Sequence, residues 1–202
     1  IICGFKEAKE KYPHLLEKYF NKYAGKLDDG IISLNTMLAN DGLFIYVPEN
    51  VVIEKTIQLV NLTHGFGNKN IFKRNLLVLE KNTQLKLVIC DHTLNNSNNF
   101  VIDVSEAFLQ ENANLQYYAL QNEPNQSSVI NSLLVNQEKN SSFTSLALSL
   151  HGGSIRNNLY VKLAGKYADA NLYGLFLTDR NQRIDNYSFI DHAVPECTSN
   201  EL

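Results

Sequence analysis

The chain has 202 residues, 44% of them hydrophobic, and carries 18 Lys and Arg against 21 Asp and Glu, which gives a formal net charge of −3. This balance gives no electrostatic reason to expect a nucleic acid or an anionic membrane surface as partner. No apolar run approaches the roughly 20 residues of a membrane span, and we expect no secretory signal. Cys3, Cys90 and Cys197 are odd in number and show no CxxC spacing, which does not indicate a disulfide framework and suits a reducing compartment.

Residues 1–40 are expected to form a helical region. Residues 1–12 are predicted as a ragged helix, and a firmer helix is predicted from Pro13 to about Tyr23, because proline suits the first helical position. Residues 28–40 predict a second, short helix that ends at turn-forming residues. We expect this region to cap the first coil of the structure that follows. Recognition of a partner is the alternative.

From residue 41 the sequence takes the period of β-strands, and residues 41–202 are assigned to a second domain. Residues 43–47 alternate in character and predict a strand, which Pro48 breaks. Residues 51–53 and 57–62 predict two further strands, followed by a loop at residues 64–68. Because the chain starts at Ile1 rather than Met and stops at Leu202, we expect a fragment truncated at the C-terminus.

A repeat dominates the rest of the chain, where an apolar run meets a polar corner four times. The first apolar residues after the corners are spaced by 30, 28 and 29 residues, namely Leu85, Leu115, Phe143 and Leu172. Such a period is typical of stacked supersecondary units, and strand signals without a helical period favour a β-solenoid with these residues in neighbouring rungs. An antiparallel meander is the alternative, although hairpin arrays usually repeat every ~8–12 residues.

Within the repeats, alternating apolar residues predict ladders that hold the stack together. The sets that share a face are Leu85, Leu87 and Ile89; Leu115, Tyr117 and Ala119; Leu146, Leu148 and Leu150; and Leu159, Val161 and Leu163. Longer polar connectors are predicted at residues 91–99, 121–128, 151–158 and 178–186. The edge of the last coil is expected to seek another strand, so self-association through exposed strands is expected.

Two pairs of residues combine thiol and imidazole groups, which are ligands for soft metals. Cys90 and His92 would share one strand face, with a buried structural cysteine as the alternative. If His192 and Cys197 converge, they could hold iron or sulfur transiently, and a packed terminal segment is the alternative. The remaining histidines are a surface residue in the first helix and two loop residues, namely His14, His64 and His151.

No catalytic group is predicted. The carboxylates considered fall in different coils or connectors and form no obvious pair for acid–base chemistry, namely Asp103, Asp179, Asp185 and Asp191. The sequence has no nucleophile elbow, phosphate-binding glycine loop or metalloprotease motif. Gly152 and Gly153 are assigned to a corner that requires positive φ. We therefore predict no catalytic, cofactor-binding or resident metal-binding residue.

Three stretches resemble one known family. Residues 41–59, which begin Asp41-Gly42-Leu43-Phe44-Ile45, are similar to the first strand of the SufB/SufD family of iron–sulfur cluster assembly scaffolds. Residues 148–159 and 191–195 resemble two further family stretches, and the helical lead-in looks more like SufD than SufB. The resemblance runs in collinear order from about Pro13 to Leu202.

This resemblance implies a mainly β fold, a right-handed parallel β-helix. It also implies a cytoplasmic complex with a SufB-like scaffold and a SufC-like ATPase, in which a nascent iron–sulfur cluster is built and passed on. The family's C-terminal histidine and cysteine have no matching positions here, so no site residue is carried over and no cofactor is expected on this chain.

The leading hypothesis is therefore a non-catalytic scaffold subunit. The alternative is a carbohydrate-active β-helix lyase or hydrolase, which predicts charged residues clustered on one sheet face and usually an export signal. A hexapeptide-repeat acyltransferase would need a six-residue period, which is absent.

Overall fold

The computed structural model describes residues 1–64, 67–94 and 98–202. A short strand and three helices come first: β1 (Ile2–Gly4), α1 (Phe5–Lys11), α2 (Pro13–Tyr19), the 3-10 turn η1 (Ala24–Lys26) and α3 (Gly30–Leu38). The remaining elements are all strands: β2 (Leu43–Val47), β3 (Ile57–Thr63), β4 (Lys69–Leu79), β5 (Gln84–Thr93), β6 (Asn99–Leu109), β7 (Asn114–Asn122), β8 (Ser128–Gln137), β9 (Ser142–His151), β10 (Ser154–Leu163), β11 (Asp169–Phe176), β12 (Arg183–His192) and β13 (Thr198–Glu201).

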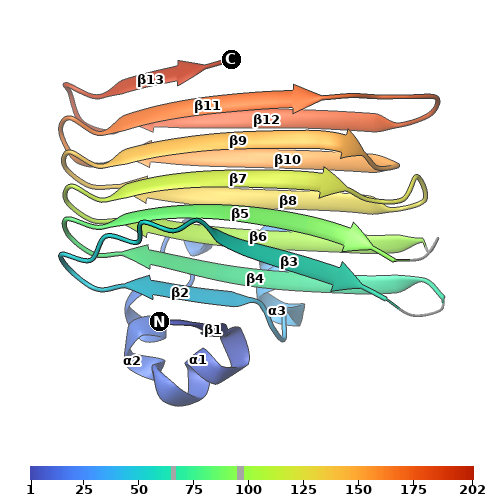
Figure 1. Cartoon of the computed structure of the whole chain (residues 1–202), viewed down its shortest axis with the longest axis horizontal. Helices are drawn as coiled ribbons and strands as arrows, with labels where there is room; N and C mark the ends of the chain where they lie inside the picture. The colour runs from blue at the N-terminus through green and yellow to red at the C-terminus, as the bar shows by residue number, and fades with distance from the viewer. Residues whose placement is uncertain (65–66, 95–97) are drawn as a thin grey trace.

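From β2 onward, successive strands alternate between two parallel sheets, so each coil contributes one strand to each sheet (Figure 1). The larger sheet has the order β1-β2-β4-β6-β8-β10-β12, and the smaller has the order β13-β11-β9-β7-β5-β3. β1 is antiparallel to β2, and all other pairs are parallel. The predicted β-solenoid is confirmed.

The predicted rungs are correct for three of the four residues. Leu85 lies opposite Leu115, and Leu115 lies opposite Phe143. The next rung was predicted wrongly. Phe143 pairs with Ala170, and Leu172 pairs with Ser145, two residues further along β9. β11 starts at Asp169 and its first inward residue is the small Ala170, which a search for large apolar residues passes over.

The corners at one end of the strands are tight and share a common backbone conformation (Figure 1). Each contains a residue in the left-handed region, with φ between 56° and 68°, namely Asn50, Asn82, Asn112, Asn140, Tyr167 and Glu196. Asparagine tolerates this conformation better than most residues. The side chain of Asn82 donates to Asn50, and that of Asn112 donates to Asn82, each over 2.8 Å. The corners are therefore joined from coil to coil by a side-chain ladder as well as by the backbone.

The opposite side carries the connectors; all four are shorter than predicted, and the last two end well before the predicted residues. β10 begins at Ser154 and β12 at Arg183, so polar residues assigned to loops lie in strands. Gly153 lies in the turn between β9 and β10, where a Cβ would come within 2.1 Å of the Asn125 carbonyl oxygen. The predicted positive φ is found at Gly152, with φ 159°, whereas close approach of the backbone requires the glycine at 153. The predicted loop at 64–68 lies partly outside the described residues, as does part of the connector at 91–99.

The interior ladders are as predicted in β5, β7 and β10. In β9 the predicted apolar set lies on the outer face instead of the inner one. Its inward side chains are Phe143, Ser145, Ala147 and Ser149, so Leu146, Leu148 and Leu150 share the outer face. Because the inward residues of β9 are mostly small and the outward ones are large and apolar, hydrophobicity alone assigns the two faces the wrong way round.

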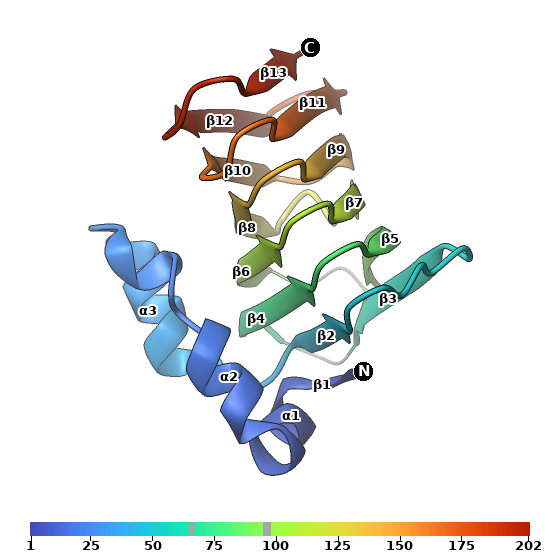
Figure 2. The same cartoon turned by 90° about the vertical axis from the view of Figure 1, so that its left-hand side faces the viewer.

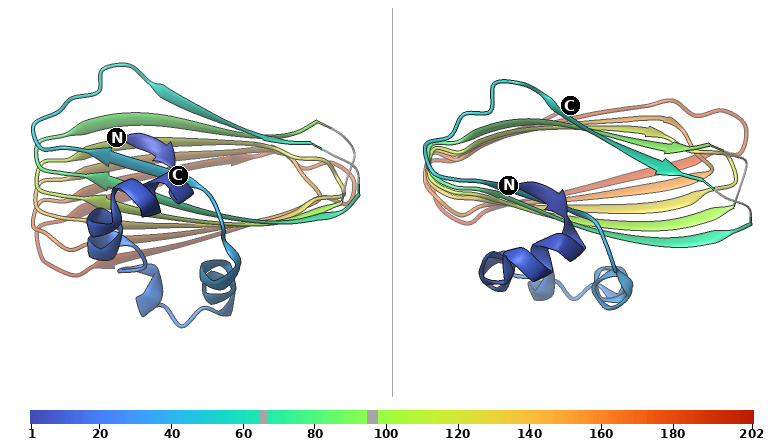
Figure 3. Two further views of the ribbon diagram at one scale, coloured as in Figure 1. Left: turned by 90° about the horizontal axis from the view of Figure 1, so that it is seen from below. Right: turned by 60° about the horizontal axis from the view of Figure 1, so that its bottom comes forward.

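The helices lie at the first end of the stack: α2 and α3 lie against the outer face of the larger sheet, and α1 lies beyond β2 (Figures 2 and 3). α1 and α2 pack on Phe44, Leu76 and Val78, whereas α3 packs beside β4 and β6. The end of this sheet is extended by β1, which occupies part of the region predicted as a ragged helix. α2 ends at Tyr19, short of the predicted Tyr23, because Phe20 is extended, and the left-handed Asn21, with φ 59°, follows it.

A buried ion pair fastens the segment after α2 to this face. The Glu106 carboxylate accepts hydrogen bonds from the backbone N–H groups of Asn21, Tyr23 and Ala24 at 2.8–3.0 Å and from Arg74 Nη2 at 2.7 Å. The Arg74 guanidinium also lies 5.0 Å from the centre of the Phe20 ring. α3 is held separately, because its Asn35 amide donates to carbonyls of both β4 and β6. Among the described residues, no helix is long and apolar enough to cross a bilayer.

Candidate functional site

The interior of the solenoid is divided into two halves of different chemistry. Beside the tight corners the inward side chains are aliphatic and fully buried, namely Leu77, Leu79, Leu85, Leu87, Leu109 and Leu115. Toward the connectors, the same strands turn polar side chains inward. The candidate site is this polar half, because burying polar groups has a free-energy cost unless they are hydrogen-bonded.

Lys73 is the centre of the polar half. It projects from β4, and its ammonium lies 2.8 Å from Asp91 Oδ1 of β5 and 2.9 Å from Asp103 Oδ2 of β6. Lys73 and Asp103 are direct neighbours across the larger sheet, whereas Asp91 belongs to the smaller sheet. This cluster therefore links the two sheets through the interior, and it carries one positive and two negative charges.

Amide and hydroxyl groups donate further hydrogen bonds to the two carboxylates. Asn61 donates to Asp91 at 2.9 Å, and Asn75 donates to Asp103 at the same distance. Ser105 donates to Asp103 at 3.2 Å, and the Asn75 carbonyl oxygen accepts the Leu43 amide at 2.8 Å. The network therefore spans three coils.

These surroundings shift two pKa values. Burial alone would lower the pKa of Lys73, but the carboxylates of Asp103 and Asp91 outweigh it, so the pKa is raised and the ammonium stays charged. The pKa of the Tyr117 phenol is raised by burial and then by the same two carboxylates, so the phenol stays protonated. Neither group is set up to exchange a proton near neutral pH.

A second cluster of polar side chains lies toward the C-terminal coils, around a cavity of about 80 Å³. Gln121 donates to Asn157 at 2.7 Å and accepts from Ser149 at 2.5 Å. Asn157 in turn accepts from Asn131 and donates to Asn186, which extends the chain of amides to β12. The cavity also borders Asp91 and Asp103, so the two polar groups meet there.

Glu123 lies at the connector end of this half. Its carboxylate accepts a 2.5 Å hydrogen bond from Thr93, and its backbone carbonyl accepts one from the His151 ring over 2.7 Å. Burial raises the pKa of Glu123, and Asp91 adds to this, whereas the hydrogen bond from Thr93 opposes it. Glu123 is thus a buried acid whose ionisation the fold disfavours.

The polar side chains of this site form a network of ion pairs and hydrogen bonds around one lysine. The lysine is neutralised by two aspartates, so it is not available as a nucleophile. Cys90 faces outward from β5, on the other side of the sheet from Asp91, and is not part of the interior network. The arrangement links the two sheets beside the cavity of about 80 Å³.

Cys90 and His92 share the outer face of β5, as predicted, but their surroundings differ. Cys90 is buried, and its sulfur accepts a long contact from the Gln58 amide at 3.5 Å, whereas His92 is half-buried. Over the described residues, no group of three or more His, Cys, Asp and Glu side chains is placed to hold a metal ion.

His192 and Cys197 make separate contacts. His192 Nε2 lies 2.9 Å from the Ser199 hydroxyl, and the Cys197 thiol lies 3.3 Å from the Gly165 carbonyl oxygen and packs against the interior core. Cys197 follows the left-handed residue of its corner, as the buried Ala168 does one coil earlier. This position agrees with the packed-segment alternative, and the ligand hypothesis stays a prediction.

The other sequence candidates are dispersed. His14 is exposed on α2, and the carbonyl of His64 accepts a hydrogen bond from Lys69. Asp103 lies in the interior, and Asp179 lies in the connector after β11. Asp185 and Asp191 lie on the outer face of β12, and each pairs with a base of β10, namely Arg156 and Lys162.

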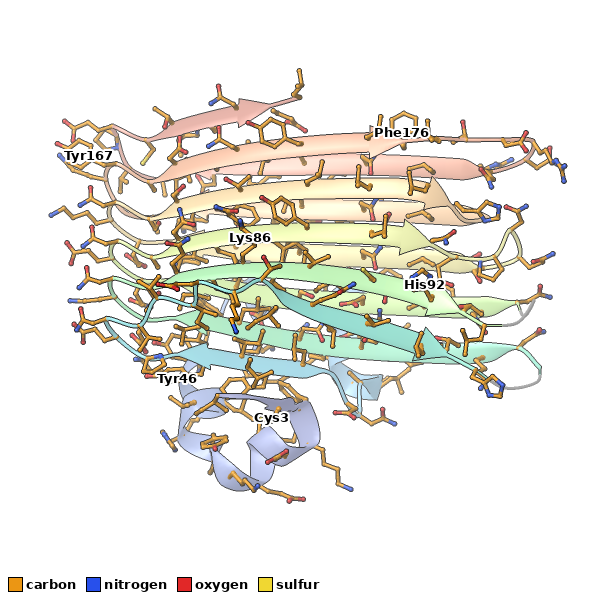
Figure 4. The ribbon with its side chains drawn as sticks, viewed as in Figure 1. Cys3, Tyr46, Lys86, His92, Tyr167 and Phe176 are labelled. Atoms are coloured by element: carbon orange, nitrogen blue, oxygen red, sulfur yellow. The ribbon has the colours of Figure 1, made fainter. Side chains whose placement is uncertain are left out.

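Sequence reasoning missed the interior network, although a signal was present. Lys73 and Asn75 have the same parity as the core residues Leu77 and Leu79, so the alternation places them inside. The next strand repeats the pattern after 30 residues, with Asp103 and Ser105 before Ala107 and Leu109. A lysine facing an aspartate at one repeat length indicates a buried charge pair. Tyr167 lies on the corner side of the stack and His92 toward the connector side (Figure 4).

Comparison with known proteins gives a consistent result. The family model described as "SUF system FeS cluster assembly, SufBD core domain" matches residues 61–202, and "SufBD protein N-terminal region" matches residues 1–59. The chain is 32% identical over 124 residues to the iron-sulfur cluster assembly protein SufD of Bacillus subtilis, which covers 60% of this chain and 28% of that protein.

Two further relatives carry SufBD family names. The protein PH1385 of Pyrococcus horikoshii is 24% identical over 188 residues, covering 92% of this chain and 42% of the relative. The protein ABCI9 of Arabidopsis thaliana is 28% identical over 118 residues, covering 58% of this chain and 25% of the relative. The chain thus spans less than half the length of these relatives. Because the core model alone matches more than half of its residues, the chain belongs to the SufBD family of iron–sulfur cluster assembly proteins.

Proposed function

We propose that this chain acts as a non-catalytic scaffold subunit in iron–sulfur cluster assembly, with a SufB-like partner scaffold and a SufC-like ATPase. The observation that carries the proposal is the match of the SufBD core model to the in-register coils of residues 61–202. On this view the cluster is the cargo of the complex, and the chain contributes a stiff surface on which partners are placed.

The physical basis is the way in which the stack resists deformation. Apolar ladders fill the corner half, and the network around Lys73 ties the sheets together in the connector half. A change at an inner coil is resisted by neighbours on both sides, because each strand between the ends of a sheet pairs with two others. Such a body is suited to holding partners at fixed positions.

Reconstitution tests the proposal directly. The full-length protein would be coexpressed with a SufB-like scaffold and a SufC-like ATPase from the same source, and the complex isolated by a tag on one partner. We expect all three to copurify and the complex to assemble a cluster on supply of iron, sulfide and ATP. Failure to copurify in any combination, or full assembly without this chain, would contradict the scaffold role.

The hypothesis that His192 and Cys197 handle iron or sulfur belongs to the same experiment. The double variant His192→Ala/Cys197→Ser, compared with the outward control Cys90→Ser, would be carried through the reconstitution. Selective loss of cluster yield in an intact complex supports a ligand role. Unchanged assembly ends that hypothesis and leaves the scaffold proposal intact. A cytoplasmic location remains part of the proposal, and cell fractionation tests it.

A further inference from the structure

The smaller sheet ends at β3, and one side of that strand is unpaired. β3 pairs with β5 alone, and within residues 1–64, 67–94 and 98–202 no other strand lies beside it. The Thr63 carbonyl accepts the Leu94 amide, so Thr63 and the residues of the same parity face β5. The backbone N–H and C=O groups of Gln58, Val60 and Leu62 therefore face the open edge.

This edge lacks the features that protect free strand edges from pairing. Its seven residues, Ile57 to Thr63, include no charge and no proline, and Val60 and Leu62 are 47% and 61% exposed. At the opposite end of the larger sheet, the edge strand β12 carries charged side chains at Arg183, Asp185 and Asp191. Natural edges are usually blunted by such charges.

The neighbouring sheet shows how an extended segment closes an edge of this kind. β1 pairs antiparallel with β2 through Ile2, Cys3 and Gly4, and it has no counterpart in the smaller sheet. The two sheets therefore end unevenly (Figure 2). A groove of about 500 Å³ lies between the ends, and its lining includes Cys3 and Gly4 of β1 and Leu59 and Asn61 of β3.

We propose that the open edge of β3 is a strand-addition site for an extended, uncharged segment of a partner polypeptide. The segment pairs with the backbone of Gln58, Val60 and Leu62. Its alternate side chains face the groove on one side and extend the apolar outer surface of Val60 and Leu62 on the other. Backbone hydrogen bonds provide affinity in this mode, and the groove selects side chains. A single segment fits better than a second solenoid, since β1 and α1 lie beyond β2 at this end.

A peptide titration tests this site. The probe is a peptide that copies Ile57–Thr63 with two lysines added at each end, and the control is the same peptide with every backbone amide N-methylated. Amide hydrogen exchange of the whole chain is followed by NMR. We expect the probe to slow exchange at Val60 and Leu62 by about tenfold or more, with Leu59 unchanged because it already pairs with β5, and we expect no effect from the control.

Two variants separate the edge from other strand surfaces. Val60→Pro removes an amide that faces the open side, a position at which an edge strand tolerates proline. It should abolish protection by the probe, whereas Val60→Thr should retain it, with both variants unfolding at temperatures close to that of the parent.

Protection by the N-methylated peptide, or no change at Val60 and Leu62 in the parent protein, would overturn the proposal. So would slow exchange at these amides in the free protein, because the edge would then already be covered. If Val60→Pro does not fold, the comparison of the two peptides on the parent decides the question.

Discussion

Lys73 and Arg74 are consecutive on β4, and their side chains lie on opposite faces of the same sheet. Arg74 points outward beneath the helices and is 1% exposed, with Glu106 fully buried beside it. Lys73 points into the solenoid, where its side chain keeps 19% of its exposure. The outer pair fastens the helical region to the stack, whereas the inner cluster joins the two sheets. A single pleat thus separates two charge centres with different structural roles.

The two centres also differ in how completely they are hydrogen-bonded. Glu106 receives four donors, but Arg74 Nε and Nη1 have no hydrogen-bond partner among the described residues. Burial lowers the pKa of Arg74 against the attraction of Glu106, yet an arginine remains charged. Removing one partner of a fully buried ion pair leaves the other charge buried, without a counter-charge and without solvent to stabilise it. The outer pair should therefore be the more costly one to break.

The largest expected effect follows from Glu106→Gln. It leaves Arg74 buried without its counter-charge, and we expect a loss of about 3–5 kcal/mol in the free energy of unfolding. The control is Glu111→Gln on the surface, where pairs contribute about 0–1 kcal/mol. Chemical denaturation measures both. A loss at Glu106 no greater than that of the control would show that the buried pair does not fasten the helices.

Asp103→Asn tests the inner centre and should cost less. Lys73 keeps Asp91 as a partner, so we expect a loss of about 1–3 kcal/mol, in the range of hydrogen bonds to charged groups. Asp185→Asn, which removes an exposed pair with Arg156, is the matched control and should change stability by less than about 1 kcal/mol. The ranking Glu106, Asp103, Asp185 sharpens the comparison, and a reversed order of the first two would break it.

Glu123 adds a pH dependence to the connector half. Because its pKa is raised in the folded protein, the folded state holds this proton more tightly than the unfolded state. Stability from this group is therefore present below the unfolded pKa, near 4.5, and is lost as pH rises through the folded value. Glu123→Gln should flatten that decline in unfolding free energy between acid and neutral pH, while Thr93 can still donate. An unchanged pH profile would contradict this.

The smallest effect is expected at the tight corners. Tyr167 occupies a left-handed position that asparagine fills in four other coils, with φ 62°. Tyr167→Asn should raise the free energy of unfolding by about 0.5–1 kcal/mol, since asparagine is less strained there. Asn112→Ala should lower it by about 1 kcal/mol for the converse reason. Thermal unfolding measures the change in stability of both variants. Changes of the same sign in the two variants would exclude the corner backbone as the cause.

The parts that followed from the sequence are those governed by local periodicity. The rung from Leu85 to Phe143 was predictable because corners repeat and large aliphatic residues follow them. Ala170 was missed because a small inward residue gives no hydrophobic signal. The outward face of β9 was misread for the same reason, since Leu146 and Leu148 are larger than the inward Ser145 and Ala147.

The parts that did not follow depend on contacts between distant residues. The lateral position of the helices rests on Glu106 meeting backbone amides more than 80 residues earlier, which no local pattern encodes. The alternation of side chains along the strands places Lys73 and Asp103 in the interior, so this pair could be predicted. The contribution of Asp91 could not, because it depends on how closely the two sheets approach.

The division of roles between the two neighbouring cations is tested most directly by native-state hydrogen exchange on Glu106→Gln and Asp103→Asn. We expect Glu106→Gln to speed exchange at Asn21, Tyr23 and Ala24 and through α2, while the strands from β8 onward keep their protection. Asp103→Asn should instead speed exchange where β4, β5 and β6 surround Lys73, with the helical region unchanged. The same uniform loss of protection in both variants would contradict the account.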